Sequence, residues 1–489
     1  MCGIIGIFGR HDVSLEMFHG LKALQHRGQS SAGFITYDGN IYPKKDAGFV
    51  ENLVRGYNEH AEIMEDHPGH IGIGHTRYST TGSDTRDALK KNAQPEYLIN
   101  PFLAACHNGN IINGGEIRGM LSRSPRTDCD IQYLLLPMAD ALPSYNKIDF
   151  DSIVEAGAQV MDLAMGSYSA LFLTAGKQEP YLIAMTDPHK IRPMVMGRKD
   201  DTWYIASESA VLTRLGVTEF RDVDSGTILS VDPKSEEPQM KKIVHERKYH
   251  CMFEYIYFAD PASWIEGRSV HRVRTEIGAA LGRRTPVKAD IVVPLPESGR
   301  RYSVGFSSAT GIPMEEGLRK DKDYRIFIFQ TQEQRDQSAR DSLVPIDAAL
   351  DGKDIVLVDD SLVRGTNMRR VIEKVRAAGA RKVHVRIGCP PLVAPCFLGI
   401  DMRSKKEFIA VDEQRNEMRA EEEIARLIGA DSLAYGTIDS LRRAIIGSSE
   451  DCGICTGCIN FPDGYPEDMR PLVEELYSRP IDDSGRAYE

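Results

Sequence analysis

The sequence lacks several features that would place the protein in a membrane, in the secretory pathway or on nucleic acid. No apolar run is long enough to span a bilayer, and the first residues show no positively charged segment followed by an apolar one, so a secretory signal is not expected. Asp and Glu number 71 against 60 Lys and Arg, and the net charge of -11 argues against general nucleic-acid binding. Internal repeats and low-complexity tracts are also absent. We expect a soluble, cytoplasmic, globular protein.

Cysteine is scarce and unevenly distributed along the 489 residues. Nine cysteines do not form a disulfide framework in a cytosolic chain of this size. Six of them lie beyond residue 250, and three of these fall within the segment CGICTGC. That bunching predicts a metal site, or local redox chemistry, near the carboxyl end.

The hydrophobic pattern changes its rhythm about halfway along the chain, and the length predicts two or three domains. In the first half, short strands mix with a few amphipathic helices, which predicts sheets flanked by helices and not a doubly wound fold. The strands are expected at 4–8, 32–38, 71–76, 102–109, 168–175, 181–186, 203–207 and 226–232, and the helices at 15–27, 129–142 and 154–166.

Beyond a polar segment at 232–248, continuous apolar strands alternate with longer helices, which is typical of a parallel sheet. These strands are expected at 289–296, 353–361 and 381–388, with a crossover helix at 368–380. We therefore expect three units, namely residues 2–245, residues 246–450 and a cysteine-containing tail at 451–489.

Cys2 follows the first methionine and precedes the buried-strand pattern GIIGIF. One interpretation is a small apolar residue in a strand. The alternative is that Met1 is removed, so that the Cys2 thiol lies beside its own α-amine, whose ordinary pKa is about 7.7–8.0. The unprotonated amine can accept the thiol proton, and one residue then supplies both nucleophile and base.

The segment DIVLVDDSLVRGTNMRR carries the most specific pattern in the chain. A buried strand ends at Asp359 and Asp360, and a loop from Ser361 to Thr366 leads into a helix. Backbone N–H groups at such a helix start can hold a monophosphate, and Gly365 permits close approach. The two carboxylates suit ribose hydroxyls, or Mg2+ bound together with a pyrophosphate.

This segment resembles the phosphoribosyl pyrophosphate signature of type I phosphoribosyltransferases, and the chain from Cys2 to about Pro466 resembles the amidophosphoribosyltransferases. The resemblance implies an α+β N-terminal-nucleophile αββα sandwich, followed by an α/β type I phosphoribosyltransferase domain with a parallel sheet. It also implies that Asp359 and Asp360 bind substrate and Mg2+, and that Ser298 in VVPLPESG helps to hold the metal. The implied 5'-phosphate loop comprises Ser361, Leu362, Val363, Arg364, Gly365 and Thr366.

Four segments of the first half, MCGIIGIFG, LQHRGQSSAG, IGIGHTRYSTTG and HNGNI, resemble the class II glutamine amidotransferase domain. The resemblance implies that Cys2 is the mature N-terminus and attacks the glutamine carboxamide, forming a thioester and releasing ammonia. Asn108 and Gly109 are implied to form the oxyanion hole, and Arg27 to order the site.

Arg77 and Asp128 are implied to bind the α-carboxylate and the α-amine of glutamine. The amino acid zwitterion itself calls for one cation and one anion, so the pairing also makes sense on charge alone. Taken singly, Arg77 also fits a surface ion pair, and Asp128 also fits the cap of the following helix.

One branch of this family carries a [4Fe-4S] cluster held by four thiolates, and Cys251 and Cys389 resemble two of its ligands. The remaining C-x-x-C pair is either Cys452 with Cys455 or Cys455 with Cys458, and the nearby GYP turn favours the second. The spacing alone suits an iron–sulfur cluster and Zn2+ equally. The other thiols are interpreted as ordinary buried residues, namely Cys106, Cys129 and Cys396.

The resemblance breaks down in the loop that the family folds over phosphoribosyl pyrophosphate. One residue is missing after Tyr324, and the family's threonine, proline and lysine are replaced by Ile326, Gln330 and Ser342. Losing the lysine removes a positive charge from the closed state. The retained residues are Gln332 and Arg335, of which Arg335 is expected to bind phosphoribosyl pyrophosphate.

A second deviation lies in the segment TDPHKIRPM, where Lys190 stands at a position that the family fills with glycine. An arginine that usually precedes the aspartate of this segment is also missing. Neither change touches the expected nucleophile or the phosphate loop.

These patterns predict an enzyme that converts glutamine and phosphoribosyl pyrophosphate to 5-phosphoribosylamine, glutamate and pyrophosphate, the first step of de novo purine biosynthesis. Ammonia is expected to pass through an internal channel to the second site. The alternatives are an amidotransferase for another phosphoribosyl-type acceptor and a non-catalytic metabolite sensor. The implied cofactors are Mg2+ and a [4Fe-4S] cluster, the implied inhibitors are purine nucleotides, and a homo-oligomer is implied, with no nucleic acid or membrane partner.

Overall fold

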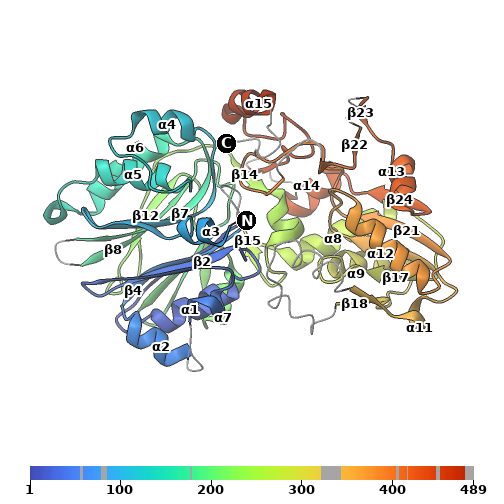
Figure 1. The fold of residues 1–489 in the computed structure, drawn as a ribbon, viewed down its shortest axis with the longest axis horizontal. Helices are drawn as coiled ribbons and strands as arrows, with labels where there is room; N and C mark the ends of the chain where they lie inside the picture. The colour runs from blue at the N-terminus through green and yellow to red at the C-terminus, as the bar shows by residue number, and fades with distance from the viewer. Residues whose placement is uncertain are drawn as a thin grey trace.

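The computed structural model has two lobes side by side, with the N-terminus at their junction (Figure 1). Among the described residues, no helix is both long and apolar enough to cross a membrane. The described residues are 1–54, 59–78, 85–176, 179–320, 343–402, 407–412, 414–415, 417–447 and 452–479.

Two antiparallel sheets form the first lobe. The seven-stranded sheet has the order β11 (Phe220–Asp222), β9 (Val195–Lys199), β10 (Thr202–Ala206), β1 (Gly3–Phe8), β4 (Ile71–Arg77), β2 (Ser31–Tyr37) and β3 (Ile41–Ala47). The six-stranded sheet has the order β13 (Gln239–Lys242), β12 (Thr227–Val231), β8 (Pro180–Thr186), β7 (Gly166–Ala175), β6 (Leu103–Ile111) and β5 (Glu96–Leu98).

The two sheets pack face to face because their strands bury side chains on both sides. In β1, Ile4 and Phe8 belong to the core between the sheets, whereas Ile5 and Ile7 belong to the core beneath the helices. This alternation is the two-residue period of a strand. The result is a layered αββα sandwich, as the sequence predicted.

Helices cover both outer faces of the sandwich. Side chains of α1 (Ser14–Ala23) and α7 (Ser209–Arg214) pack on the seven-stranded sheet, and those of α5 (Gln132–Ala141) and α6 (Phe150–Leu163) pack on the other. The remaining helical segments of this lobe are η1 (Val50–Leu53), α2 (Glu59–Asp66), α3 (Arg86–Lys91), α4 (Gly114–Met120) and η2 (Tyr145–Lys147).

A four-stranded parallel sheet forms the centre of the second lobe. Its order is β17 (Ile291–Pro294), β20 (Asp354–Asp359), β21 (Lys382–Ile387) and β24 (Ser432–Tyr435). The helix α12 (Thr366–Ala377) connects β20 to β21, as the crossover pattern predicted. The other helices are α8 (Val270–Arg284), α9 (Arg300–Thr310), α11 (Asp347–Leu350), α13 (Glu421–Ile428) and α14 (Ile438–Ile446).

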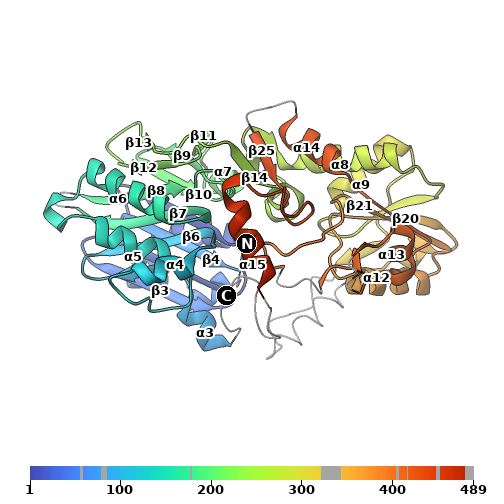
Figure 2. The ribbon, with the colours of Figure 1, turned by 90° about the horizontal axis from the view of Figure 1, so that it is seen from above.

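The junction between the lobes is built from short elements that are far apart in the sequence. The strand β14 (Lys248–Cys251) pairs in parallel with β25 (Cys452–Cys455), and Figure 2 shows α15 (Arg470–Ser478) lying over the junction. The predicted boundary at residue 245 falls between β13 and β14. The other short elements are η3 (Glu254–Phe258), β15 (Trp264–Ile265), β16 (Arg268–Ser269), β18 (Leu318–Lys320), β19 (Leu343–Pro345), β22 (Val411–Asp412), β23 (Glu417–Met418) and η6 (Glu467–Met469).

Lys190, one of the two deviations from the family pattern, lies in this junction. Its φ of 50° is in the left-handed region that glycine favours, which explains why a glycine is common there. The buried Lys190 ammonium pairs with Glu266 and contacts Asp222 at 3.5 Å. Lys248 binds Glu266 at 2.9 Å and Asp224 at 2.8 Å. The lysine is therefore accommodated by acidic residues from both lobes.

Candidate active site

Cys2 lies just before β1, the central strand of the seven-stranded sheet. Its thiol donates to the Tyr78 carbonyl at 3.8 Å, and the residue is 9% exposed. Its backbone carbonyl accepts a hydrogen bond from Arg27 Nε at 2.8 Å. The backbone of the expected nucleophile is thus fixed, while part of the residue remains accessible.

The amine that precedes Cys2 is also buried. In the structure this amine belongs to Met1, and burial lowers its pKa to about 5, against an opposing effect of Cys2 and with a further lowering by Arg27 and Arg192. The α-amine of Met1 is therefore mostly unprotonated at neutral pH, whereas the proposed base is the α-amine that Cys2 would acquire on removal of Met1.

The predicted oxyanion residues lie on β6, directly beside Cys2. The Asn108 amide, oriented so that both of its atoms have partners, donates to the Cys2 carbonyl and accepts from Arg27 Nη2, each at 3.3 Å. Gly109 has a φ of 152°, and a Cβ there would lie 1.9 Å from the Ser167 carbonyl oxygen. No side chain fits at Gly109, so its backbone can approach its neighbours closely.

Arg27 is fully buried between two carboxylates that come from different lobes. Its Nη1 donates to Glu208 at 2.5 Å, and its Nη2 donates to Glu254 at 2.7 Å. The pKa of Arg27 is raised because these two carboxylates outweigh the effect of burial. The guanidinium is therefore a fixed cation that touches both Cys2 and Asn108.

The two residues predicted to bind glutamine differ in their surroundings. Arg77, at the end of β4, is 2% exposed. Asp128 is exposed, and its backbone N–H donates to Asn92 Oδ1 at 3.3 Å. Asp128 does not cap the following helix either, because the cap position of α5 is Ile131.

Asp130, two residues further on, is the buried aspartate of this segment. Its Oδ2 lies 3.0 Å from His107 Nε2 and accepts from the Ile111 N–H at 3.1 Å. Burial alone would raise the pKa of Asp130, but His107, the Ile111 amide and Arg77 together lower it. Asp130 is thus a buried carboxylate that interacts electrostatically with Arg77. The sequence analysis did not single it out, and the role of Asp128 stays a prediction.

The second predicted site lies at the carboxyl end of β20, where parallel sheets bind ligands. Asp359 and Asp360 are 7% and 4% exposed. Ser298 Oγ donates to Asp359 at 3.1 Å, and Ser361 Oγ donates to Asp360 at 2.6 Å. Burial and the neighbouring Asp360 raise the pKa of Asp359 well above its usual range. Two buried carboxylates and a hydroxyl form an oxygen donor set of the kind that suits Mg2+.

The predicted phosphate loop leads from these acids into α12. Gly365 has a φ of 75° immediately before the helix, and the side chain of Arg364 projects outward to Glu407 at 2.7 Å. Leu362 is buried, Val363 is half-buried and Thr366 is exposed at the helix start. The first N–H groups of a helix have no partner within the helix, so those of α12 can bind an anion. Phosphate binding by this loop stays a prediction.

The divergent loop lies outside the described residues. This applies to Arg335, which is expected to bind phosphoribosyl pyrophosphate, and to the replaced positions Ile326, Gln330 and Ser342. The role of Arg335 stays a prediction.

Tyr257, in η3, connects the surroundings of the two sites. The pKa of Tyr257 is raised to about 12 by desolvation of its hydroxyl and then by Asp360, Tyr78 and Asp359. Tyr78 is the residue whose carbonyl accepts the Cys2 thiol hydrogen bond. Tyr257 is 52% exposed, and its hydroxyl is within electrostatic range of Tyr78 and of both acids.

Four buried thiols gather at the junction of the lobes. Cys251 lies opposite Cys455 in the β14–β25 pair. The group comprises Cys251, Cys396, Cys455 and Cys458. Cys396 raises the pKa values of the other three thiols, Cys251 raises those of Cys455 and Cys458, and Cys455 raises that of Cys458. A set of four buried thiols suits an iron–sulfur cluster or Zn2+. Among the described residues, no group of three or more His, Cys, Asp or Glu side chains has metal-binding geometry.

Two other cysteines considered as ligands share only part of this arrangement, since Cys389 raises the pKa of Cys458 but is not among the groups that act on Cys251 or Cys455. Cys389 follows β21, and its backbone N–H donates to the Asp360 carbonyl at 2.7 Å. Cys452 pairs with Lys248 in the strand register. The pKa of the Cys452 thiol is raised to about 11, mainly by burial and to a smaller extent by the charge of Glu266. The register thus turns Cys452 toward the charged network and Cys455 toward Cys251.

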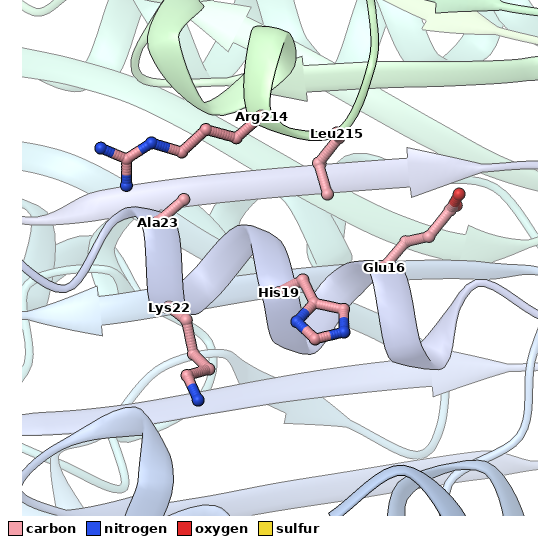
Figure 3. Close-up of a pocket in the computed structure, with 6 residues that line it drawn as sticks. All are labelled: Glu16, His19, Lys22, Ala23, Arg214 and Leu215. Carbon is pink, nitrogen blue, oxygen red and sulfur yellow. The ribbon is translucent and has the colours of Figure 1, made fainter.

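Two surface cavities lie outside the nucleophile site. One, of about 500 Å³, is formed by α1 and α7 and is lined by side chains of mixed charge (Figure 3). The other, of about 510 Å³, lies beside the phosphate loop and includes Arg364 and Glu407. The first cavity is lined by Glu16, His19, Lys22, Ala23, Arg214 and Leu215, which are not among the predicted site residues.

Comparison with known proteins agrees with this architecture. A family model described as a glutamine amidotransferase domain matches residues 75–214. A solved glutamine phosphoribosylpyrophosphate amidotransferase from B. subtilis, complexed with ADP and GMP, is 31% identical with a TM-score of 0.80, covering 96% of this chain and 100% of that one. The fold and these matches define the class: a glutamine amidotransferase joined to a phosphoribosyltransferase domain.

Sequence relatives identify the family within that class. The amidophosphoribosyltransferase of Methanothermobacter thermautotrophicus is 39% identical over 483 residues, which cover 96% of each protein. That of Methanocaldococcus jannaschii is 38% identical over 482 residues, covering 93% of this chain and 96% of the relative. The chain therefore belongs to the amidophosphoribosyltransferase family and is an enzyme, and the predicted family and fold are confirmed.

Proposed function

We propose that this protein converts glutamine and phosphoribosyl pyrophosphate to 5-phosphoribosylamine, glutamate and pyrophosphate. The observation that carries the proposal is the placement of η3. Glu254 of η3 accepts a hydrogen bond from Arg27, which also contacts Cys2. Tyr257 of the same segment interacts electrostatically with Asp359 and Asp360. Ammonia released at the thiol would thus have a short path to the second site.

The first half-reaction is glutamine hydrolysis. Once Met1 is removed, the α-amine of Cys2 takes the thiol proton, and the sulfur attacks the carboxamide carbon. The Asn108 side chain and the Gly109 N–H stabilise the tetrahedral oxygen. The α-ammonium gives its proton to the departing nitrogen, ammonia leaves, and water then cleaves the thioester to give glutamate and the free thiol.

Glutamine recognition rests on Arg77 and, in our proposal, on Asp130 in place of Asp128. Asp130→Asn is expected to raise the glutamine KM by about 10- to 100-fold, because a charge-assisted hydrogen bond to the α-amine is worth about 1.5–3 kcal/mol. Asp128→Asn should leave KM within about twofold, since Asp128 is exposed. Steady-state glutamate release by the two variants checks this. A larger effect at Asp128 would restore the original assignment.

The second half-reaction places ammonia on the anomeric carbon of the ribose as pyrophosphate departs. The N–H groups of the loop from Ser361 to Thr366 hold the 5'-phosphate, and Asp359 and Asp360 orient the ribose hydroxyls. Ser298, Asp359 and Asp360 would hold Mg2+, which supplies neutralisation of the pyrophosphate charge. Arg335 adds a positive charge from the loop.

A structural [4Fe-4S] cluster is proposed at the thiol group, with Cys251, Cys396, Cys455 and Cys458 as ligands in place of a set with Cys389. In anaerobically purified protein, Cys396→Ser should therefore reduce the number of iron–sulfur clusters from about one per chain to nearly none. Cys389→Ser should retain it. Iron, sulfide and zinc analysis decides: cluster loss confined to Cys389→Ser would contradict the ligand set, and zinc without iron would contradict the cluster.

Regulation by purine nucleotides and self-association form part of the proposal. Nucleotide regulation is supported by the B. subtilis relative, which was solved as a complex with ADP and GMP. In such an enzyme, inhibition by end products limits the committed use of phosphoribosyl pyrophosphate.

The test is glutamate release by anaerobically purified protein in Mg2+, with and without phosphoribosyl pyrophosphate. We expect a large stimulation by phosphoribosyl pyrophosphate, with pyrophosphate released in step with glutamate. Glutamine hydrolysis that is indifferent to phosphoribosyl pyrophosphate would favour another acceptor, as the divergent loop allows. No hydrolysis at all would favour a non-catalytic sensor.

A further inference from the structure

Arg27 has two acidic partners that differ in what else they hold. Glu208 is bonded on every side: besides Arg27, it binds His26 at 2.9 Å, the Asp260 N–H at 2.8 Å and Ser263 Oγ at 2.9 Å. Glu208 is thus part of the scaffold that connects α7 to the second lobe.

Glu254 has only arginine partners among the described residues. Its Oε1 accepts from Arg27 Nη2 at 2.7 Å and lies 4.0 Å from Arg192 Nη1. Its Oε2 is buried and has no hydrogen-bond partner, although a buried carboxylate oxygen normally has one. The residue is 1% exposed. Among the described residues, the hydrogen bond and the ion-pair contact of its side chain are thus confined to guanidinium groups, although its charge also raises the pKa values of the N-terminal amine and of Cys251.

Arg27 passes that contribution to the reacting groups. Its Nε holds the Cys2 carbonyl at 2.8 Å, and its Nη2 lies 3.3 Å from the Asn108 amide oxygen. The same Nη2 is the atom bonded to Glu254. A change in the position of the carboxylate therefore shifts the atom that orients the predicted oxyanion residue.

Glu254 also comes from the second lobe, at the first position of η3. Tyr257, in the same short segment, lies near Asp359 and Asp360. The segment thus contacts the glutamine site at one end and the acidic pair at the other.

We propose that Glu254 is a positioning residue for the glutaminase site: its carboxylate fixes Arg27, which holds the Cys2 backbone and the Asn108 amide in the geometry for attack. This inference deepens the proposed function and rests on Cys2 as nucleophile, but not on the identity of the acceptor. It assigns the second lobe a direct part in glutamine hydrolysis.

The test is Glu254→Gln, which keeps the size of the side chain and removes its charge. We expect kcat for glutamine hydrolysis to fall by about 10- to 100-fold, because small misplacements of reacting groups cost rates of this order. The glutamine KM should stay within about twofold, since Arg77 and Asp130 are untouched. Synthesis from free ammonia should not change, because it bypasses Cys2.

Glu266→Gln is the matched control. Glu266 is also an acid of the second lobe at the junction, but its ion pairs are with Lys190 and Lys248 and not with Arg27. We expect it to retain the kcat of the wild type. An equal loss in both variants, or a parallel loss of ammonia-dependent synthesis in Glu254→Gln, would mean a merely structural role and overturn the proposal. A kcat of Glu254→Gln within twofold of the wild type would also overturn it.

Two further measurements keep the test decisive. If Glu254→Gln does not fold, Glu254→Asp moves the carboxylate away by one methylene and should lower kcat by a smaller factor; unchanged turnover would count against the proposal. If wild-type protein makes nothing from ammonia and phosphoribosyl pyrophosphate, the acceptor assignment has failed. In that case glutamate release without acceptor, and the labelling rate of Cys2 by a diazoketone analogue of glutamine, still test Glu254.

Discussion

Cys2→Ser is expected to abolish glutamine-dependent synthesis, lowering its kcat by at least about 10⁴-fold, while synthesis from free ammonia continues. The reason is that a serine hydroxyl is a far weaker nucleophile than a thiol beside a neutral amine. The Arg27 and Asn108 contacts involve the backbone carbonyl of Cys2 and are retained. Parallel assays with glutamine and with ammonium salts measure the separation of the two activities.

Cys106→Ser is the matched control for that variant. Cys106 is a buried thiol on β6, and its Sγ donates to the Gly74 carbonyl at 3.6 Å, a bond that a hydroxyl can also make. Burial raises the pKa of the Cys106 thiol well above its usual value, so it is a poor nucleophile. Loss of activity in Cys106→Ser, or survival of glutamine use in Cys2→Ser, would refute the assignment of the nucleophile.

Asp359→Asn should produce the opposite pattern. Synthesis is expected to fall by about 10²-fold or more with either nitrogen source, since the ribose and Mg2+ lose a carboxylate at the point of charge development. Basal glutamine hydrolysis without acceptor should persist, because Cys2 is unaffected. Pyrophosphate release and glutamate release, assayed side by side, check this prediction.

The thermal stability of Asp359→Asn provides a second test. Burial beside Asp360 raises the pKa of Asp359, so ionising it costs folding free energy once the pH exceeds the pKa of the unfolded chain. Removing the charge should leave the thermal midpoint at pH 7 unchanged or higher. Asp354→Asn, on the same strand at its exposed end, is the control and should keep full activity. A destabilised Asp359→Asn would mean that the carboxylate is structural.

The elements were largely predictable because their patterns are local. The strand expected at 71–76 is β4, and the crossover helix expected at 368–380 is α12, shifted by a turn or less. In both cases the period of apolar residues matches the buried face. Ends were less accurate, since a terminal residue is fixed by its cap and its neighbours and not by periodicity.

The site was less predictable where burial comes from distant segments. Asp128 and Asp130 flank one cysteine and precede one helix, so the sequence does not distinguish them; β6 buries only Asp130 through His107 and Ile111. Glu254 could have been noticed as an acid in the apolar run CMFEYIYF, because such an acid is rarely buried without a cation. Its partner, however, lies more than 200 residues earlier in the chain.

The parallel pairing of β14 with β25 also bears on the order of events during synthesis. Cys251 cannot pair with Cys455 until the ribosome has added about 200 more residues. At ordinary elongation rates this takes about 10–40 s. The first lobe can fold meanwhile, but Arg27 lacks Glu254 until the second lobe docks. A nascent chain would therefore carry an incompletely assembled thiol site, and would not release ammonia before an acceptor site exists to use it.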